Sequence, residues 1–174
     1  VQKKGTNFIN LHEIIYNFTR QNKLIDINLL NKFYLKDNRD KKIVFTNGCF
    51  DILHPGHIDL FKEGKKQGDI LIVGLNSDKS IKKIKGNSRP INKFNHRVKM
   101  LEVINSIDFI VNFNEITPIN LIKKIKPNIL LKGGDYLKKN IIGGKFVQSY
   151  GGKVLTSKFL KGYSSSKIIN KIKN

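Results

Sequence analysis

Short runs of consecutive apolar residues alternate with amphipathic stretches along most of this chain. Five such runs follow residue 40, at positions 43–45, 70–73, 109–111, 129–131 and 154–155. Runs that are apolar at every position, rather than at every second one, are typical of strands covered on both faces of a sheet. The sequence therefore predicts five buried strands.

The stretches between these runs have apolar residues at three- and four-residue spacing, which predicts helices over 57–66, 95–107, 118–125 and about 165–172. Thr117 is expected to cap the third helix, with Pro118 in its first turn. Strands that alternate with helices predict an α/β fold, a Rossmann-like doubly wound five-stranded parallel sheet. We interpret residues 1–40 as a short helical N-terminal extension, and residues 41–174 as one domain.

Polar and glycine-containing turns follow most of the predicted strands. In an open parallel sheet the carboxyl ends of the strands lie along one edge, where ligands bind. These turns, although distant in sequence, are therefore expected to line one crevice. Their candidate ligand-binding residues are Thr46, Asn47, Gly48, Asn76, Asp78, Lys132, Gly133, Asp135, Ser164, Ser165 and Ser166.

The turn after the first strand, residues 46–57, is the most informative segment. It joins an apolar strand to the start of a helix, where His54 and His57 stand three residues apart. Free backbone N–H groups and the positive end of the helix dipole make such a place an anion site. Gly56 has no side chain, so a phosphate can approach the backbone closely. The N–H groups around Gly48, Cys49 and Phe50 are expected to add donors.

The composition of the chain argues against a nucleic-acid-binding protein and against a membrane-spanning protein. The net charge is +20, but only four of the 33 basic residues are arginines, and the lysines are spread over the whole chain. Because dedicated nucleic-acid readers favour arginine, we predict no nucleic-acid partner. No apolar run approaches the ~20 residues of a membrane span, and a single cysteine cannot form an intramolecular disulfide. These features favour a cytoplasmic protein without a membrane partner.

The histidine turn resembles that of the His-x-Gly-His nucleotidyltransferases, the cytidylyltransferase-like family, and within it most closely the heptose-1-phosphate adenylyltransferase domain of ADP-heptose synthase. The resemblance covers roughly residues 41–172. Besides the histidine turn it rests on the segments 74–78 (GLNSD), 85–90 (KGNSRP), 95–97 (NHR), 131–136 (LKGGDY) and 162–166 (GYSSS). The final segment has serines where the family usually has threonines, and no arginine precedes it, unlike in the cytidylyltransferases.

The resemblance implies transfer of AMP from ATP to a heptose 1-phosphate, giving ADP-heptose for lipopolysaccharide and releasing pyrophosphate. His54 and His57 would contact the triphosphate. Lys85 and Arg89 would bind phosphates from a mobile loop, although Lys82 or Lys83 could take that role. Arg97 would bind the sugar phosphate, or alternatively form an ion pair on the helix surface. Asp51 would orient a histidine, contact the metal or cap the turn.

The family also implies Mg²⁺ held mainly by the ATP phosphates, so no protein metal site is predicted, and a homo-oligomer, typically a dimer. Two other functions stay open. A cytidylyltransferase acting on glycerol 3-phosphate or a similar alcohol phosphate would keep the reaction type. A basic nucleic-acid-binding protein would leave the histidine turn unexplained.

Overall fold

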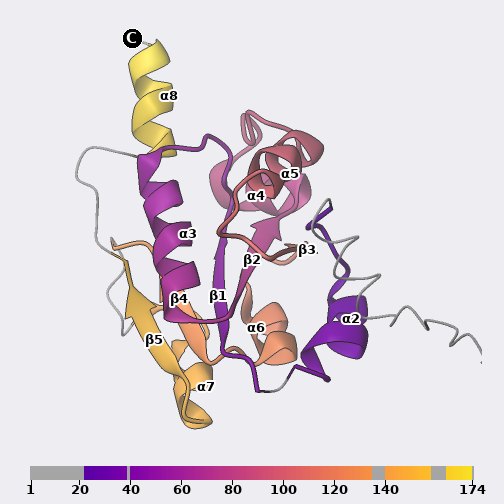
Figure 1. Cartoon of the computed structure of the whole chain (residues 1–174). Helices are drawn as coiled ribbons and strands as arrows, with labels where there is room; N and C mark the ends of the chain where they lie inside the picture. The colour runs from indigo at the N-terminus through magenta and orange to yellow at the C-terminus, as the bar shows by residue number, and fades with distance from the viewer. Residues whose placement is uncertain (1–21, 39, 135–139, 158–163, 174) are drawn as a thin grey trace, which may run out of the picture.

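The computed structural model describes residues 22–38, 40–134, 140–157 and 164–173. Its centre is a five-stranded sheet, drawn in Figure 1, with the order β3-β2-β1-β4-β5 and every neighbouring pair parallel. The strands are β1 (Ile43–Gly48), β2 (Ile70–Asn76), β3 (Phe109–Phe113), β4 (Ile129–Lys132) and β5 (Lys153–Thr156). The predicted Rossmann-like fold with five parallel strands is confirmed.

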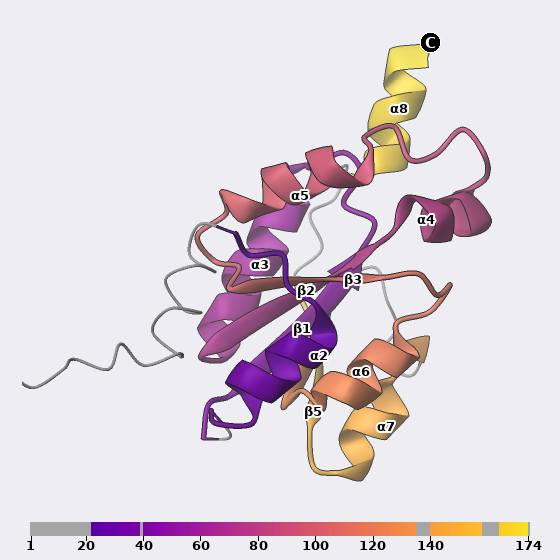
Figure 2. The same cartoon turned by 90° about the vertical axis from the view of Figure 1, so that its right-hand side faces the viewer.

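Helices cover both faces of the sheet (Figures 1 and 2). One face packs against α3 (Pro55–Gln67) and α5 (Phe94–Glu102) through Leu60, Phe61, Val98 and Leu101. The other face packs against α2 (Ile27–Leu30), a π-helical turn η1 (Asn31–Leu35), α6 (Ile119–Ile125) and α7 (Gly144–Ser149). The remaining helices, α4 (Asp78–Lys85) and α8 (Ser165–Lys173), follow β2 and β5 respectively.

The four predicted helices are present, but one ends well before its predicted end and another lacks its expected cap. The helix predicted to run to residue 107 ends at Glu102, because residues 104–107 form a turn that still buries Ile107. Apolar spacing alone did not separate that turn from the helix. Helix α6 begins at Ile119, with Pro118 in the N-cap position and no side-chain cap, so the expected cap by Thr117 is wrong.

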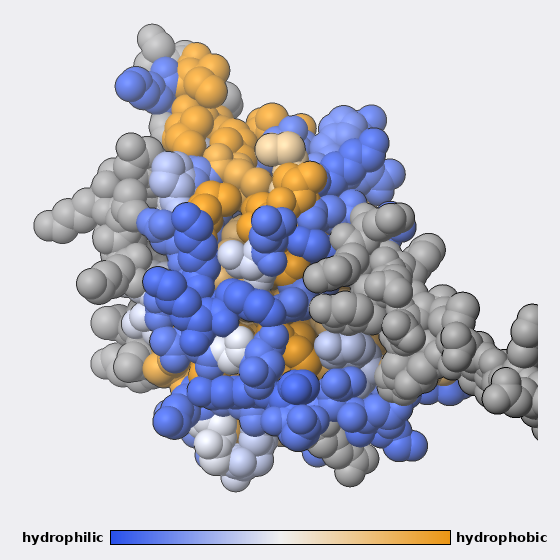
Figure 3. Space-filling view, viewed as in Figure 1, coloured by the Kyte–Doolittle hydropathy of each residue, from blue (hydrophilic) through white to orange (hydrophobic). Residues whose placement is uncertain are grey.

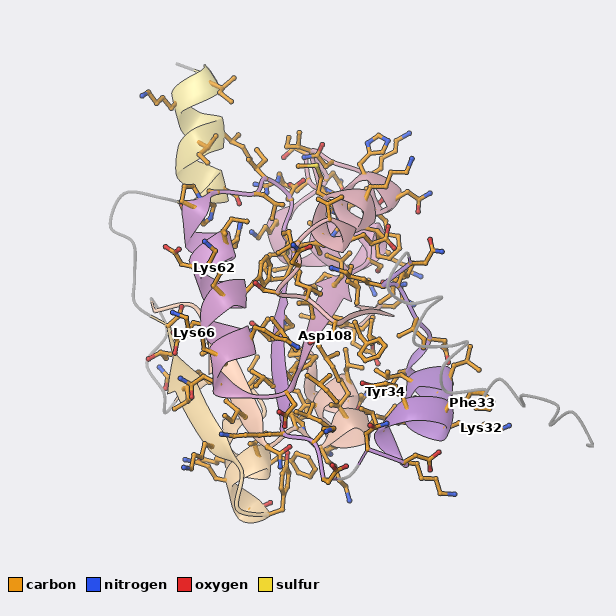
Figure 4. All side chains as sticks on the ribbon, viewed as in Figure 1. Lys32, Phe33, Tyr34, Lys62, Lys66 and Asp108 are labelled. Carbon is orange, nitrogen blue, oxygen red and sulfur yellow. The ribbon has the colours of Figure 1, made fainter. Side chains whose placement is uncertain are left out.

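The described part of the N-terminal extension belongs to the packed body. Leu30 is fully buried, and Tyr34 packs edge-on against Phe109 with ring centroids 4.8 Å apart. In Figure 4 Tyr34 lies on the sheet side of this segment and Lys32 on the outer side. The backbone at residues 23–25 also pairs with Ile110, extending the sheet beyond β3. Hydrophobic periodicity predicted the helical part and missed this pairing, which involves a very short segment.

The hydropathy of the surface differs between α3 and α8. Figure 3 shows hydrophilic side chains over α3 and apolar ones gathered on α8 and around its base. Lys62 and Lys66 lie on the outer side of α3 (Figure 4), and Ile172 of α8 is 76% exposed. None of the helices in the described part of the chain combines the length and apolar character that a membrane span requires.

Candidate active site

The site is built at the carboxyl end of the sheet, where β1 lies between β2 and β4. Chain connections leave β1 toward β2 on one side, whereas β4 joins on the other side only after β3. The crevice at such a switch point is where open α/β sheets bind ligands. The predicted turn after β1 and the predicted Lys132–Gly133 turn after β4 both follow strands that meet there.

The two histidines stand together at the start of α3. His54 precedes the first residue of the helix and uses no side-chain cap, and the N–H of His57 donates to its carbonyl at 2.9 Å. Their imidazole rings are stacked, with centroids 3.7 Å apart and planes 25° from parallel. The α3 N-terminus therefore brings two imidazoles together at the positive end of the helix dipole.

Phe50 supports this pair from the protein side. Its ring contacts His57 edge-on and also lies against Phe61, with centroids 5.1 Å apart in both cases. The backbone of Phe50 has a φ of 44°, which a non-glycine residue adopts only at some energetic cost. A Cβ at Gly48 would lie 3.0 Å from the Phe50 ring, so the glycine in this turn makes room for the ring that backs His57.

The imidazoles are held in their neutral form. Burial, the neighbouring His54 and the charge of Lys85 lower the pKa of His57 to about 3, and burial lowers the pKa of His54. Within the described part of the chain, the Nδ1 atoms of both histidines are buried without a hydrogen-bond partner. The pair therefore offers neutral hydrogen-bond donors, rather than permanent charges, near neutral pH.

This electrostatic setting predicts a pH dependence of stability. Unfolded His57 takes up a proton as the pH falls below about 6.5, whereas folded His57 does so only near pH 3. The contribution of neutral His57 to the free energy of unfolding is therefore present above the pKa of the unfolded state, and it is lost as the pH falls toward the folded pKa. Urea unfolding at several pH values should show a shallower acid loss in His57→Gln than in the unmodified chain; equal slopes would contradict the buried neutral imidazole.

Lys85 is the candidate lysine whose charge acts on His57. It is exposed at the last position of α4, before Gly86, which has a φ of 90°. Its positive charge acts on His57 and on Cys49, whose thiol pKa is raised mainly by burial. Neither Lys82 nor Lys83 is among the influences on these two groups. Of the three candidates, Lys85 is therefore the one whose charge lowers the pKa of His57.

Asp51 and Arg89 form an ion pair with each other. The Asp51 carboxylate is 2.6 Å from the Arg89 guanidinium, and both side chains are buried. The same carboxylate accepts the backbone N–H groups of Ile91 and Asn92. Asp51 therefore holds the 89–92 segment against the histidine turn. Of the three alternatives for Asp51, the hydrogen bonds within the described residues show backbone N–H groups as its partners and no histidine, and Arg89 is paired with Asp51.

Arg97 departs most clearly from its sequence-based assignment. Its side chain is 1% exposed, and its guanidinium donates to the carbonyls of Cys49, Asn76 and Asn92 and to the Asp78 carboxylate. The ion pair with Asp78 is therefore buried on the arginine side rather than on a helix surface, and the contact of Arg97 with a sugar phosphate stays a prediction. The helix pattern placed Arg97 near the site but could not show that backbone carbonyls surround it.

Asn76 and Asp78 are likewise part of the framework. The Asn76 side chain is buried and donates to Ser80 at 2.9 Å, while Asp78 accepts from Arg97 and from the N–H of Phe94. Both residues therefore support the framework of the crevice, and their role in lining the nucleotide side stays a prediction.

The turn after β4 reaches across the switch point. Lys132 donates from Nζ to the side-chain and backbone oxygens of Asn47, joining the ends of β4 and β1. Thr46 is fully buried on β1, and its hydroxyl has no hydrogen-bond partner among the residues described. Gly133 follows Lys132 at this edge, and the predicted nucleotide residue Asp135 lies outside the described residues.

The serines at the start of α8 approach the same turn. The Ser165 hydroxyl donates to the carbonyl of Ile52 at 2.9 Å, which places the first turn of α8 beside the histidine loop. Ser164 directly precedes the helix, and the side chain of Ser166 lies outside the described part of the structure. The prediction that this distant segment converges on the crevice holds for Ser165.

Asn92 is the residue that sequence reasoning missed. Its N–H and side-chain amide donate to the carboxylate and carbonyl of Asp51, and its carbonyl accepts from Arg97. It thus joins the Asp51–Arg89 pair to the Arg97–Asp78 pair. An isolated asparagine in a polar loop has no distinguishing sequence pattern, so nothing in the sequence could have singled it out.

This arrangement of a parallel sheet, a switch-point crevice and a histidine pair at a helix N-terminus defines a nucleotidyltransferase-type site. The family model described as cytidylyltransferase-like matches residues 45–171, and the chain belongs to that family. It is similar to the bifunctional protein HldE of Campylobacter fetus (49% identity, 83% of this chain and 31% of that protein) and of Helicobacter acinonychis (47%, 99% and 36%).

The chain spans about a third of the length of these curated relatives. Among solved structures, a lipopolysaccharide core biosynthesis protein from Thermoplasma volcanium aligns with a TM-score of 0.59 at 28% identity, covering 70% of this chain and 99% of the other. A pantoate-beta-alanine ligase from Francisella tularensis aligns with a TM-score of 0.60 over 86% of this chain and 77% of that protein. At 20% identity the second likeness supports the fold alone.

Proposed function

We propose that this chain transfers AMP from ATP to a heptose 1-phosphate, forming ADP-heptose and pyrophosphate for lipopolysaccharide core synthesis. The observation that carries the proposal is the stacked His54–His57 pair at the N-terminus of α3, beside the switch point of the sheet. The similarity to HldE proteins and to a lipopolysaccharide core biosynthesis protein supports the choice of pathway.

The reaction forms a bond between a sugar-phosphate oxygen and the α-phosphorus of ATP, while the bond from that phosphorus to the pyrophosphate oxygen breaks. Such transfers need in-line positioning and stabilisation of charge on phosphate oxygens more than covalent chemistry. His54 and His57 would donate hydrogen bonds to those oxygens. The positive end of the α3 dipole would add attraction for the phosphate from a fixed direction.

The protein would leave most of the metal binding to the nucleotide. Mg²⁺ typically keeps several waters and binds through substrate phosphates with only one or two carboxylates. The carboxylates of Asp51 and Asp78 already accept hydrogen bonds from arginines and backbone N–H groups. A Mg²⁺ ion arriving with ATP therefore fits these residues better than a preformed protein site does. The ion would neutralise charge on the triphosphate.

The choice of ATP over CTP and of a heptose over an alcohol phosphate rests on the Leu131–Tyr136 motif and on the lack of an arginine before Gly162. Cytoplasmic location, dimer formation and the absence of a nucleic-acid partner stay predictions from the sequence and the family resemblance. The identity of the product tests the proposal directly. Mass spectrometry after incubation with ATP, Mg²⁺ and heptose 1-phosphate should detect ADP-heptose; unchanged substrates with a folded chain would contradict it.

Lys85 provides a test of the phosphate site with an internal control. Lys85→Gln is expected to lower kcat/KM for ATP by roughly tenfold to a hundredfold, because it removes a cation whose charge acts on His57. Lys83→Gln changes an exposed lysine of the same helix and should stay close to the unmodified chain. Steady-state pyrophosphate release measures both. Equal losses in the two variants would indicate a general field effect and contradict the assignment of Lys85.

A further inference from the structure

One guanidinium, that of Arg97, joins four segments beneath the candidate site. It donates to Cys49 in the histidine turn at 2.7 Å, to Asn76 at the end of β2 at 2.9 Å, and to Asn92 at 3.1 Å. Its fourth bond, at 2.7 Å, goes to Asp78, the first residue of α4. Because α4 ends at Lys85, Arg97 connects the turn that carries the histidines directly to the helix that carries the cation.

The geometry of this connection is strongly constrained. Arg97 is 1% exposed, and its planar fork matches acceptors that come from different directions, which a lysine ammonium on a flexible stem does not reproduce. Asp78 balances the charge and also accepts the N–H of Phe94, which fixes the start of α5. Through Asn92 the same network continues to the buried pair of Asp51 and Arg89.

We infer that Arg97 and Asp78 are positioning residues that fix the distance and orientation between the histidine pair and Lys85. This inference rests on the proposed function, because it assumes that the two groups act on one triphosphate. A fixed spacing matters most in the transition state, where charge develops on oxygens that must face both groups. Loss of the network therefore slows the chemical step more than it weakens binding of ATP.

The variants Arg97→Lys and Asp78→Asn test the inference against a matched control, Asp108→Asn. Asp108 also accepts from one cationic side chain, Lys65, and from one backbone N–H, that of Leu71. The two carboxylate side chains have similar exposure, 37% for Asp78 and 31% for Asp108. Asp108 directly precedes β3, at the amino end of that strand, whereas the histidines follow the carboxyl end of β1.

We expect Arg97→Lys and Asp78→Asn to lower kcat by roughly tenfold to a hundredfold. Their KM for ATP should change by less than about threefold, since the lost interaction acts in the transition state. Asp108→Asn should keep kcat within about twofold, even if all three variants lose similar thermal stability. In NMR spectra the imidazole signals of His54 and His57 should shift in the first two variants and stay in place in the control.

Three results would overturn the inference. Unchanged kcat in Arg97→Lys and Asp78→Asn would mean that the network serves stability alone. A raised KM for the sugar phosphate with kcat retained would return Arg97 to direct substrate binding. Imidazole signals that stay in place in both variants would show that the network does not position the histidines. If the unmodified chain shows no turnover, the proposed function fails, and the imidazole signals alone decide the inference.

Discussion

Replacing His54 or His57 by alanine is expected to lower kcat by roughly 10²–10³, the effect of losing one preorganised donor, or about 3–4 kcal/mol of transition-state stabilisation. In the proposed reaction, the stacked and neutral imidazoles would donate to phosphate oxygens on which negative charge grows. KM for ATP should change far less than kcat, because the hydrogen bond strengthens only as charge develops. Steady-state pyrophosphate release measures both constants.

His96 supplies the control for this prediction. It is an exposed histidine on α5, only one residue before the buried Arg97. His96→Ala should retain the turnover of the unmodified chain, which separates loss of the site from loss of any imidazole. Near-normal turnover in His54→Ala and His57→Ala would exclude the proposed role of the pair.

The largest loss of stability is expected from Asp51→Asn, at about 3–5 kcal/mol, because the change leaves the Arg89 guanidinium buried without its counter-charge. The Asp51 side chain is 1% exposed and the Arg89 side chain 10% exposed. The amide introduced by this substitution would also accept the N–H groups of residues 91 and 92 more weakly than the carboxylate does. Urea unfolding at neutral pH measures the difference.

Asp69→Asn serves as the comparison, because Asp69 is exposed and its carboxylate accepts one backbone N–H, that of Lys42. The stability lost in Asp69→Asn should stay within about 1 kcal/mol. Equal losses in the two variants would show that the buried pair contributes no more than a surface hydrogen bond.

Low pH should weaken the interaction of Asp51 with Arg89 and with the N–H groups of residues 91 and 92. Burial favours the protonated acid, but the N–H groups of Asn92 and Ile91 and the Arg89 side chain outweigh it, so the pKa of Asp51 is lowered. A lowered folded pKa gives stability that is present above the unfolded pKa and is lost as the pH falls through the folded value. The stability gap between the unmodified chain and Asp51→Asn should therefore narrow in acid, and a constant gap would contradict this linkage.

The fold could be predicted because strands that are buried on both faces leave uninterrupted apolar runs. Those runs located all five strands, and the intervening helical spacing implied parallel connections. The exact end of α5 could not be predicted, since Ile104 and Ile107 continue its apolar spacing while lying in a turn. The pairing of residues 23–25 with Ile110 left no pattern because it is too short to alternate.

The site was predictable where local sequence fixes local geometry. A strand, a glycine turn and Pro55 after His54 are enough to place two histidines at a helix start. The partners of long side chains were not predictable in this way. Arg97, Arg89, Asp51 and Asp78 all occur in the predicted crevice segments, but their pairing depends on how three loops meet in space. The spacing of residues in the sequence does not show which backbone carbonyls from other segments will surround a side chain. The sequence alone therefore could not distinguish a buried arginine from one that binds a ligand.

The most direct test of the proposed activity is pyrophosphate release in the presence of Mg²⁺, with ATP and CTP each combined with heptose 1-phosphate and glycerol 3-phosphate. The proposal predicts release only from ATP with heptose 1-phosphate. Release from CTP with glycerol 3-phosphate would instead make the chain a cytidylyltransferase and contradict the assignment.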